Sequence, residues 1–486
     1  MIRIHLRSSS MLYSGYVSFR NRIRVNQTSA VALSPAGPPA TALMTPEPSA
    51  PVIAPAAPSS RVAPEPLAQR LGMRFLIVLV FLHFSFLHEI LGYVLRSPKT
   101  LILLFTNVGT IALILASGTL GKAMRSHVSR WWFAFLFWFM LSVPFSFWKG
   151  ESLRFLGSFL FNVLPMLIAV AALVSTLKDC FHIMYAVACG AFVNLLSSNL
   201  FRPDDLTGRL SLQLGSIGNS NDFAAHLLYV LPFLMFLAWV SNFKILKAAC
   251  FLGIVFGLYL IENTGSRGAL LACLVVLAFI FLRASGSIRI AFAILAPAML
   301  LFLALLLPKS LLLRYATLWS NEAAATQVGA TESYENRSYL LRTSLRFTAE
   351  HPLFGVGPGE FADVEGSEAR AQGRHGSWLV SHNSYTEISS EMGFPGAICF
   401  VGALVSTMLL LNRNYRRASQ SERLKKLRAA SFCLMISFTG FAVAIFFLSL
   451  AYTFYMPFMS GLAIAISRVI DRELAGTASA PRLRTA

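Results

Sequence analysis

The sequence has few charged residues. Only 13% of its 486 residues are Asp, Glu, Lys or Arg, and 56% are apolar, whereas roughly a quarter of the residues in soluble domains are charged. Mostly apolar stretches of about 20 residues, the length of a bilayer-spanning helix, recur from Phe75 to residue 470. The composition excludes a typical soluble enzyme and predicts an all-α, polytopic integral membrane protein.

The sequence also lacks the patterns of disulfide-rich and zinc-binding proteins. Its 6 cysteines lie in or beside apolar stretches without a C-x-x-C pair, so neither a disulfide framework nor a zinc ribbon is indicated. His88 and Glu89 lack the second histidine of an H-E-x-x-H zinc site. Asp204 and Asp205 have two interpretations, a metal-binding pair or a solvated acidic loop. Our prediction is that the protein uses no metal and no cofactor.

The net charge of +19 indicates membrane topology rather than nucleic-acid binding. With a cytoplasmic N-terminus, most of the 41 Lys and Arg fall in segments on the cytoplasmic side, as the positive-inside rule requires. Membrane lipids with anionic headgroups are expected partners of these charges, and nucleic acid is not. The strongest anchor between two spans consists of Arg413, Arg416, Arg417, Arg423, Lys425, Lys426 and Arg428.

The apolar stretches predict about 12 transmembrane helices. They are approximately 75–95, 100–120, 131–148, 155–177, 180–200, 223–240, 245–261, 268–282, 288–307, 393–411, 430–450 and 452–470. Five regions follow: a cytoplasmic basic and Pro/Ala-rich tail (1–73), helices one to nine (74–307), an extracytoplasmic loop (308–392), helices ten to twelve (393–470) and a cytoplasmic tail (471–486). Met44 or Met73 is an alternative start of the chain.

The long loop between the ninth and tenth spans is predicted to contain helices of its own, because a loop of this length without structure is unusual. The first is an amphipathic helix over residues 334–350. Tyr334, Leu341, Leu345 and Thr348 share one stripe of it, and Pro352 ends it.

A second helix is predicted directly after His382. Ser384 and Glu387 have the spacing of a capping box, and Gly393 suits a left-handed residue at the helix end. His382 therefore stands just before a helix N-terminus, where free backbone N–H groups favour anions.

Three residues on the outer face are candidates for chemistry: Arg267, Arg337 and His382. Arginine offers a planar fork that suits phosphate, and two arginines can neutralise a diphosphate. Histidine can act as a general base near neutral pH. Each also has a structural interpretation, since Arg267 can snorkel or pair with Glu262, Arg337 can be a surface charge, and His382 can be a polar residue beside a helix.

Four motifs resemble the O-antigen ligase and O-antigen polymerase superfamily. They are GNSNDFA (218–224), TGSRGALL (264–271), NRSYLLRTSLRFTAEHPLFGVGPGEF (336–361) and SHNSYTEISSEMGFPGA (381–397). Their order and the long outer loop are similar to the family over about residues 200–410. The resemblance implies a metal-independent glycosyltransferase in the bacterial inner membrane, with its active site on the periplasmic face.

The resemblance also implies roles for individual residues. The donor would be a glycan on undecaprenyl diphosphate, held by Arg267 and Arg337, and His382 would deprotonate the acceptor hydroxyl. The acceptor would be a sugar of lipid A-core in a ligase, or another lipid-linked glycan in a polymerase. Further residues of the same motifs or of family-like positions are assigned to substrate binding: Arg209, Asn221, Asn383 and Glu387.

Three functions stay open at this point. We favour the ligase, with a polymerase of O-antigen or exopolysaccharide repeat units as the alternative, because the two share the motifs. A transporter or flippase for lipid-linked sugars is the third, although such carriers often consist of two similar halves and this sequence shows no repeat. The polar group of His83, His88 and Glu89 in the first span has no assigned role.

Overall fold

The computed structural model describes residues 66–94, 100–200, 209–211, 219–284, 286–316 and 328–478. Every regular element within these ranges is helical, which confirms the all-α prediction. The described residues belong to one compact unit, residues 64–486. Most of the predicted tail lies outside the described residues, and the first helix, α1, begins at Leu67, inside that predicted tail.

Eight described helices are long and apolar enough to cross a membrane, so the protein is a multi-pass membrane protein. They are Leu67–Ser85 (α1), His127–Phe145 (α5 with a 3-10 turn), Lys149–Leu173 (α6, a π-helical turn and α7), Leu177–Ser198 (in α8), Ser220–Val240 (α9), Lys244–Asn263 (α10), Ser384–Ala418 (α17) and Glu422–Phe447 (containing α18). The other four predicted spans are also helical, as α3 (Thr100–Ala116), α11 (Arg267–Arg283), α12 (Gly286–Leu305) and α19 (Tyr455–Ala478). The total of twelve spans stays a prediction.

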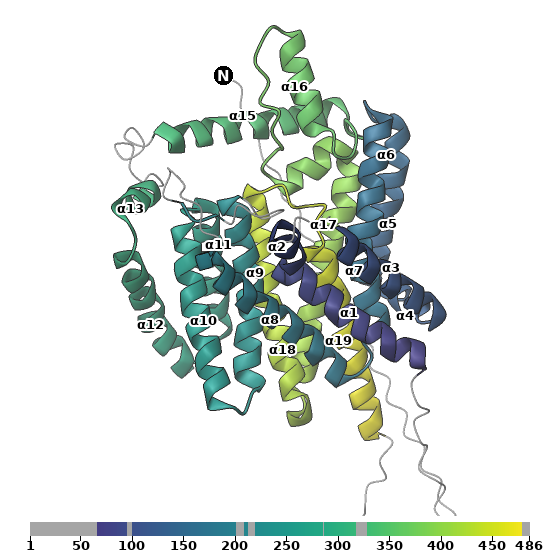
Figure 1. Cartoon of the computed structure of the whole chain (residues 1–486), viewed down its shortest axis with the longest axis vertical. Coiled ribbons are helices and arrows are strands. Elements are labelled where there is room, and N and C mark those ends of the chain that lie inside the picture. Colours follow the sequence, from purple (N-terminus) through teal and green to yellow (C-terminus); the bar gives the residue numbers. More distant parts are fainter. Residues whose placement is uncertain are drawn as a thin grey trace, which may run out of the picture. The chain divides into compact units, whose positions relative to one another are not determined.

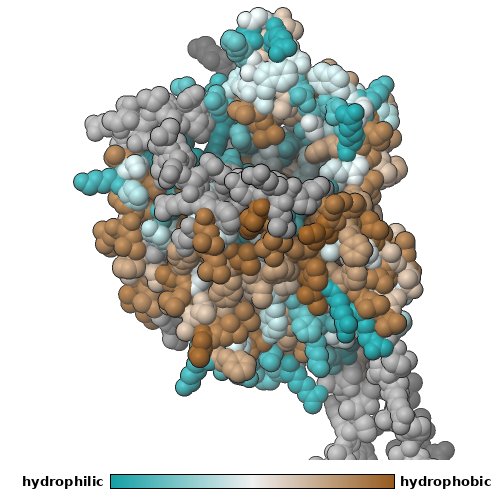
Figure 2. Space-filling view, in the orientation of Figure 1, coloured by the Kyte–Doolittle hydropathy of each residue, from teal (hydrophilic) through white to brown (hydrophobic). Residues whose placement is uncertain are grey.

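The long helices pack side by side as a bundle. Helix α9 contacts α8, α10 and α18, and α17 contacts α5, α18 and α19 (Figure 1). Helix α15 (Val328–Glu350) crosses one end of the bundle with α16 (Phe361–Ala371) above it, and we call this the outer end. Figure 2 shows an apolar band between hydrophilic residues at both ends, the distribution expected of a protein surrounded by lipid.

The polar group of the first span has a structural role. At Phe86 the backbone turns left-handed, with φ 52°, and this separates α1 from the short helix α2 (Leu87–Val94). Such a break leaves carbonyls without helical partners. A ring nitrogen of His88 lies 3.0 Å from the carbonyl of Leu82, and one of His83 lies 3.0 Å from that of Leu79. The two histidines thus bond to the backbone around the break.

The predicted helix over residues 334–350 is present as the second half of α15, but its stripe is only partly buried. Thr348 is buried as expected, whereas Tyr334 is 66% exposed and Leu345 52% exposed. The buried apolar residues are instead Leu340 and Phe347, which pack in one cluster with residues of α16. The helix period predicted the element, but its buried face is set by where α17 and α16 lie against it.

The helix after His382 is also present, with a different cap from the one predicted. The side chain of Asn383 accepts hydrogen bonds from the backbone N–H groups of Tyr385 and Thr386, at 3.0 and 3.2 Å. Ser384 instead donates to the carbonyl of Leu448. Gly393 is left-handed as predicted, with φ 67°, but the helix continues beyond it after a kink.

Candidate active site

The turn between α10 and α11 positions the first candidate residue. Gly265 is left-handed, with φ 60°, and Ser266 caps α11 by accepting a hydrogen bond from the Ala269 N–H at 3.4 Å. Arg267 is the first residue of α11 and is partly buried. The turn thereby places a guanidinium group beside a helix N-terminus, where the helix dipole also favours an anion.

Two predicted substrate-binding residues join this turn. Arg209 donates from Nε to the carbonyl of Thr264 at 2.8 Å and from Nη2 to the side-chain oxygen of Asn221 at 3.1 Å. Asn221 lies in the first turn of α9. These contacts bring residues from three separate parts of the sequence to one place at the outer end.

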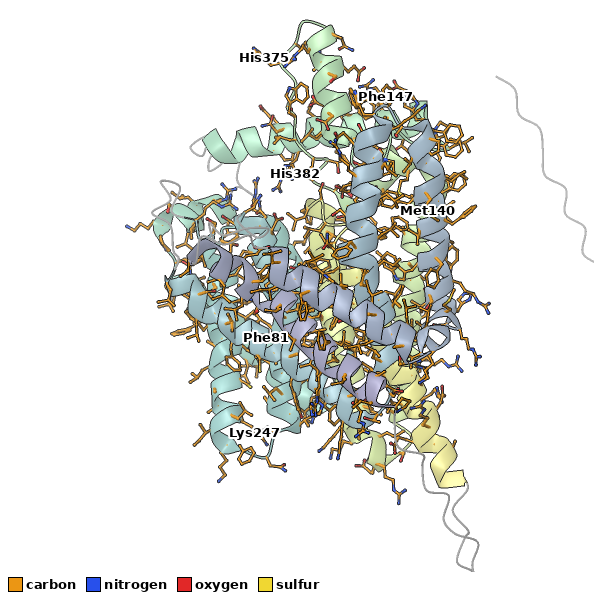
Figure 3. All side chains as sticks on the ribbon, turned by 45° about the vertical axis from the view of Figure 1, so that its right-hand side comes forward. Phe81, Met140, Phe147, Lys247, His375 and His382 are labelled. Carbon is orange, nitrogen blue, oxygen red and sulfur yellow. The ribbon has the colours of Figure 1, made fainter. Side chains whose placement is uncertain are left out.

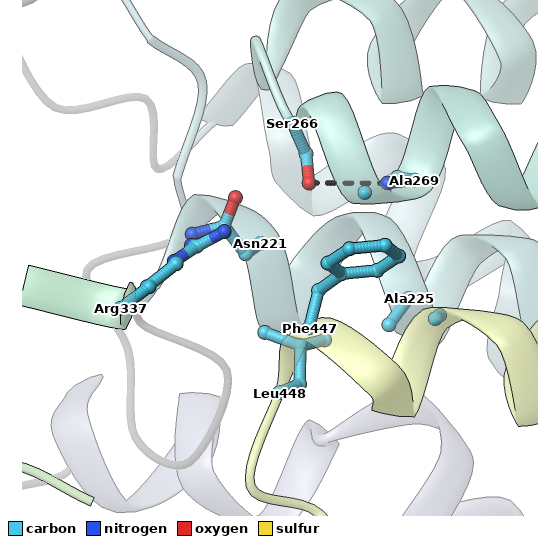
Figure 4. Close-up of a pocket in the computed structure, with 9 residues that line it drawn as sticks. Asn221, Ala225, Ser266, Ala269, Arg337, Phe447 and Leu448 are labelled. Atoms are coloured by element: carbon cyan, nitrogen blue, oxygen red, sulfur yellow. Dashed lines mark hydrogen bonds between the residues drawn. The ribbon is translucent and has the colours of Figure 1, made fainter. Parts of the chain in front are cut away.

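Arg337 reaches the same place from α15. It lines a narrow pocket together with Asn221, Ser266, Phe447 and Leu448. Figure 4 shows its side chain extending from α15 toward Asn221, with Ser266 and Phe447 on the neighbouring walls. Gly268 and Ala269 of α11 also line the pocket, so Arg337 lies opposite the N-terminus that Arg267 begins.

Burial and neighbouring positive charges lower the pKa of Arg337. Burial is the main cause, followed by the positive charges of Arg267 and Arg314, while Asp222 acts in the opposite direction. Burial and the charge of Arg267 lower the pKa of Arg314 in the same way. Several guanidinium groups are therefore close enough to repel one another, and a bound anion would relieve that repulsion.

His382 lies at the outer end between α16 and α17 (Figure 3). Its backbone N–H donates to the hydroxyl of Ser449 at 3.0 Å, directly after Leu448 of the pocket wall. Its backbone is left-handed, with φ 54°, a strained conformation that is typical of functional sites. Burial, and then the positive charge of Arg337, lower the pKa of His382 to about 4, so its imidazole is neutral at pH 7.

The structure thus places Arg267, Arg337, His382, Arg209 and Asn221 at the outer end, and of these Arg337 and Asn221 line the pocket. The other two predicted substrate-binding residues lie in the helix that follows His382. The side chain of Asn383 is used as the cap of α17. Glu387 is buried, with an Oε2 atom that has no hydrogen-bond partner, and it does not line the pocket.

A second buried carboxylate next to Glu387 has a structural function. Glu391 accepts hydrogen bonds from the backbone N–H groups of Gly359 and Phe361, at 2.9 and 3.2 Å. These contacts fix the start of α16 against α17. Helix α17 therefore begins at the capping Asn383 and carries, two turns later, the buried acid that holds α16.

Two residues of the site were missed by the sequence analysis. Arg314 lies in the short outer helix α13 (Lys309–Ala316) and donates from Nε to the carbonyl of Gly265 at 3.0 Å. Asp222 belongs to the GNSNDFA motif, which was the available signal for it. No motif in the sequence indicated a role for Arg314. An arginine after Leu311–Leu313 is what the polar side of an ordinary amphipathic helix would contain.

No group of three or more His, Cys, Asp or Glu within the described ranges has the geometry of a metal site. The acidic pair Asp204 and Asp205 lies outside those ranges. The chemistry of the described pocket is that of an anion site, because its polar groups are one arginine, an asparagine, a serine and a helix N-terminus.

Residues 249–401 match the family model described as O-Antigen ligase. The matched segment contains Arg267, Arg337 and His382, and it confirms the resemblance predicted from the motifs. No curated protein matches the chain.

Proposed function

We propose, from the match of residues 249–401 to the O-Antigen ligase family model, that the protein transfers a glycan from undecaprenyl diphosphate to a sugar hydroxyl of lipid A-core. The reaction takes place at the outer end of the bundle, on the periplasmic side of the bacterial inner membrane. It needs no metal, because guanidinium groups take the place of a cation at the diphosphate.

The arginines bind and activate the donor. The diphosphate lies between Arg337 and the N-terminus of α11, beside Arg267. When the bond between the anomeric carbon and the diphosphate breaks, negative charge grows on the leaving oxygen. Preorganised positive groups in a partly buried pocket stabilise that charge more than water does, and the fork of arginine suits two phosphate oxygens at once.

His382 acts on the acceptor. Its neutral imidazole takes the proton of the acceptor hydroxyl while the hydroxyl oxygen attacks the anomeric carbon from the side opposite the diphosphate. One C–O bond forms, the other breaks, the configuration inverts, and undecaprenyl diphosphate leaves. The pKa of His382, about 4 in the free protein, is low for a base, and neutralisation of Arg337 by the donor raises it toward the operating pH.

One observation supports this proposal above the others. Arg337 and the α11 N-terminus share a pocket, and the charge of Arg337 reaches His382. An anion site and a neutral base are therefore adjacent at the same end of a membrane protein. Group transfer uses both an anion site for the leaving diphosphate and a base for the acceptor hydroxyl, and this arrangement offers both.

Reconstituted protein tests the class of function. Purified protein in liposomes, given a lipid diphosphate donor and lipid A-core with EDTA present, should form glycosylated lipid A-core. Movement of intact donor across the bilayer without bond cleavage would support the transporter instead. Loss of transfer in EDTA, restored by a divalent cation, would contradict the metal-free mechanism.

The acceptor distinguishes a ligase from the alternative polymerase of repeat units. A strain that lacks the ligase should keep free lipid A-core and accumulate long glycans on the lipid carrier. A strain that lacks a polymerase should instead show lipid A-core with a single repeat unit. The second result would keep the donor chemistry of the proposal and change its acceptor.

A further inference from the structure

Helix α13, which carries Arg314, is held against the turn before Arg267 by residues on either side of Arg314. Leu311 and Tyr315, its neighbours on α13, are both buried. The hydroxyl of Tyr315 donates to the backbone carbonyl of Glu262 at 2.7 Å. Helix α13 is therefore fixed against the end of α10, and Arg314 lies directly over the α10–α11 turn.

The turn is held by two arginines in the same way. Arg209 and Arg314 each donate from Nε, one to the carbonyl of Thr264 and the other to the carbonyl of Gly265, at 2.8 and 3.0 Å. On the opposite sides of these peptide planes, the N–H of Gly265 donates to the carbonyl of Glu262 and the N–H of Ser266 to the hydroxyl of Thr264. The Thr264–Gly265 and Gly265–Ser266 peptide groups are thus each hydrogen-bonded at both the C=O and the N–H.

The fit around Gly265 is close. A Cβ atom added there would lie 3.0 Å from the side chain of Leu311 and 3.1 Å from Cδ of Arg314. The left-handed backbone at this position, with φ 60°, is one that glycine adopts without strain. The path of the chain into Ser266 and Arg267 therefore depends on the position of Arg314.

Arg314 is not among the residues that line the pocket. Its positive charge also works against Arg337, whose pKa it lowers together with burial and Arg267. Arg267 is also outside the lining and also lowers the pKa of Arg337, so what distinguishes Arg314 is its hydrogen bond to the carbonyl of Gly265.

We propose that Arg314 is a positioning residue, which fixes the Thr264–Gly265 turn through its Nε–H group and thereby sets Arg267 and the α11 N-terminus against the diphosphate. The proposal rests on the proposed function for the identity of the anion. It does not depend on that function for the contact itself, so the two can be tested separately.

Two substitutions separate the hydrogen bond from the charge. In Arg314→Gln the side-chain amide nitrogen occupies the position of Nε, so the donor to Gly265 is kept and the charge is lost. In Arg314→Lys a methylene occupies that position, so the charge is kept and the donor is lost. Lys309→Gln is the matched control, because Lys309 is exposed on the same helix and its substitution removes one charge without touching the turn.

The measurement is the affinity of the purified full-length protein for inorganic pyrophosphate in EDTA, by titration calorimetry, with the transfer kinetics alongside. Positioning predicts that Arg314→Gln stays near the wild-type affinity, while Arg314→Lys loses about tenfold, the cost of one hydrogen bond in a binding site. The KM for the donor should rise in the same order, and Lys309→Gln should match the wild type.

Three results would overturn the proposal. If Arg314→Lys binds normally and Arg314→Gln does not, Arg314 contributes only its charge. If both bind normally, it is not needed, and if both fail equally while Lys309→Gln is normal, the donor position is not what matters. Pyrophosphate affinities in the predicted order without any glycan transfer would instead keep the role of Arg314 and refute the proposed function.

Discussion

Arg337 on α15 and His382 before α17 are electrostatically linked: the positive charge of the guanidinium adds to burial in lowering the pKa of the imidazole to about 4. An anion bound at Arg337 would offset the contribution of its charge, while the larger contribution of burial would remain. Under the proposed function this link would couple donor binding to the base, because a diphosphate at Arg337 would raise the pKa of His382.

The first prediction concerns pH. A base must be unprotonated to act, so activity falls as the pH drops through its pKa. For the free protein this pKa is about 4, and kcat/KM, which reports free groups, should decline only near pH 4. The acid limb of kcat, which reports the donor complex, should lie at higher pH, because the donor neutralises Arg337. Initial rates at saturating and limiting donor measure both limbs. Coincident limbs, or a kcat limb below that of kcat/KM, would show that the coupling is absent.

The second prediction replaces the base without disturbing its backbone. Asparagine tolerates the left-handed conformation that His382 adopts, so His382→Asn should be expressed and inserted normally while transfer falls by about 10²- to 10⁴-fold. His375→Asn is the control, since His375 is exposed in the same segment (Figure 3), and it should be fully active. Near-normal transfer by His382→Asn would remove this residue from the mechanism.

The third prediction tests the fork of Arg337. Lysine keeps the charge but cannot bind two phosphate oxygens in one plane. Arg337→Lys should lower kcat/KM by about 10- to 100-fold, which corresponds to the loss of one charge-assisted hydrogen bond. Arg342→Lys, an exposed substitution on the same helix, serves for comparison and should have no effect. If Arg337→Lys works as well as the wild type, Arg337 supplies only electrostatic background.

The fourth prediction concerns Gly265. An alanine there must adopt φ 60° and approach Leu311 and Arg314 to about the closest distances that Cβ atoms tolerate. Gly265→Ala should cost about 1–3 kcal/mol of stability, seen as a lower Tm, and should weaken pyrophosphate binding because the turn shifts. Gly286→Ala, at a position where an added Cβ meets nothing within 4 Å, should change neither quantity. A Gly265→Ala variant with unchanged Tm and affinity would mean that the turn is not under constraint.

The sequence predicted where helices form better than it predicted which side of each helix is buried. Apolar length and helix period predicted the helical segments, including the helix that ends before Pro352. They did not predict that Leu340 and Phe347 form part of the buried face of α15, because that face is determined by the positions of α17 and α16, which are tertiary properties. Asn383 replaced Ser384 as the cap for a similar reason, since both residue types suit the position and Ser384 is held instead by the backbone at Leu448 and Leu450.

In the candidate site, too, the sequence could not predict contacts that depend on tertiary structure. Motifs pointed to Arg267, Arg337 and His382, but nothing in an isolated sequence distinguishes Arg314 from an ordinary basic residue of a surface helix. Its contact to Gly265 arises only when α13 folds back over the α10–α11 turn. Glu387 was assigned to substrate binding from its motif; it is buried and outside the pocket lining, and its role in binding stays a prediction.

The most direct test of the central claim is a cryo-EM structure with a bound, non-hydrolysable undecaprenyl diphosphate sugar. The account predicts that the diphosphate lies between Arg337 and the N-terminus of α11, in contact with the Arg267 guanidinium, and that the His382 imidazole faces the anomeric carbon from the side opposite the diphosphate. A diphosphate bound elsewhere, or an anomeric carbon out of reach of His382, would contradict it.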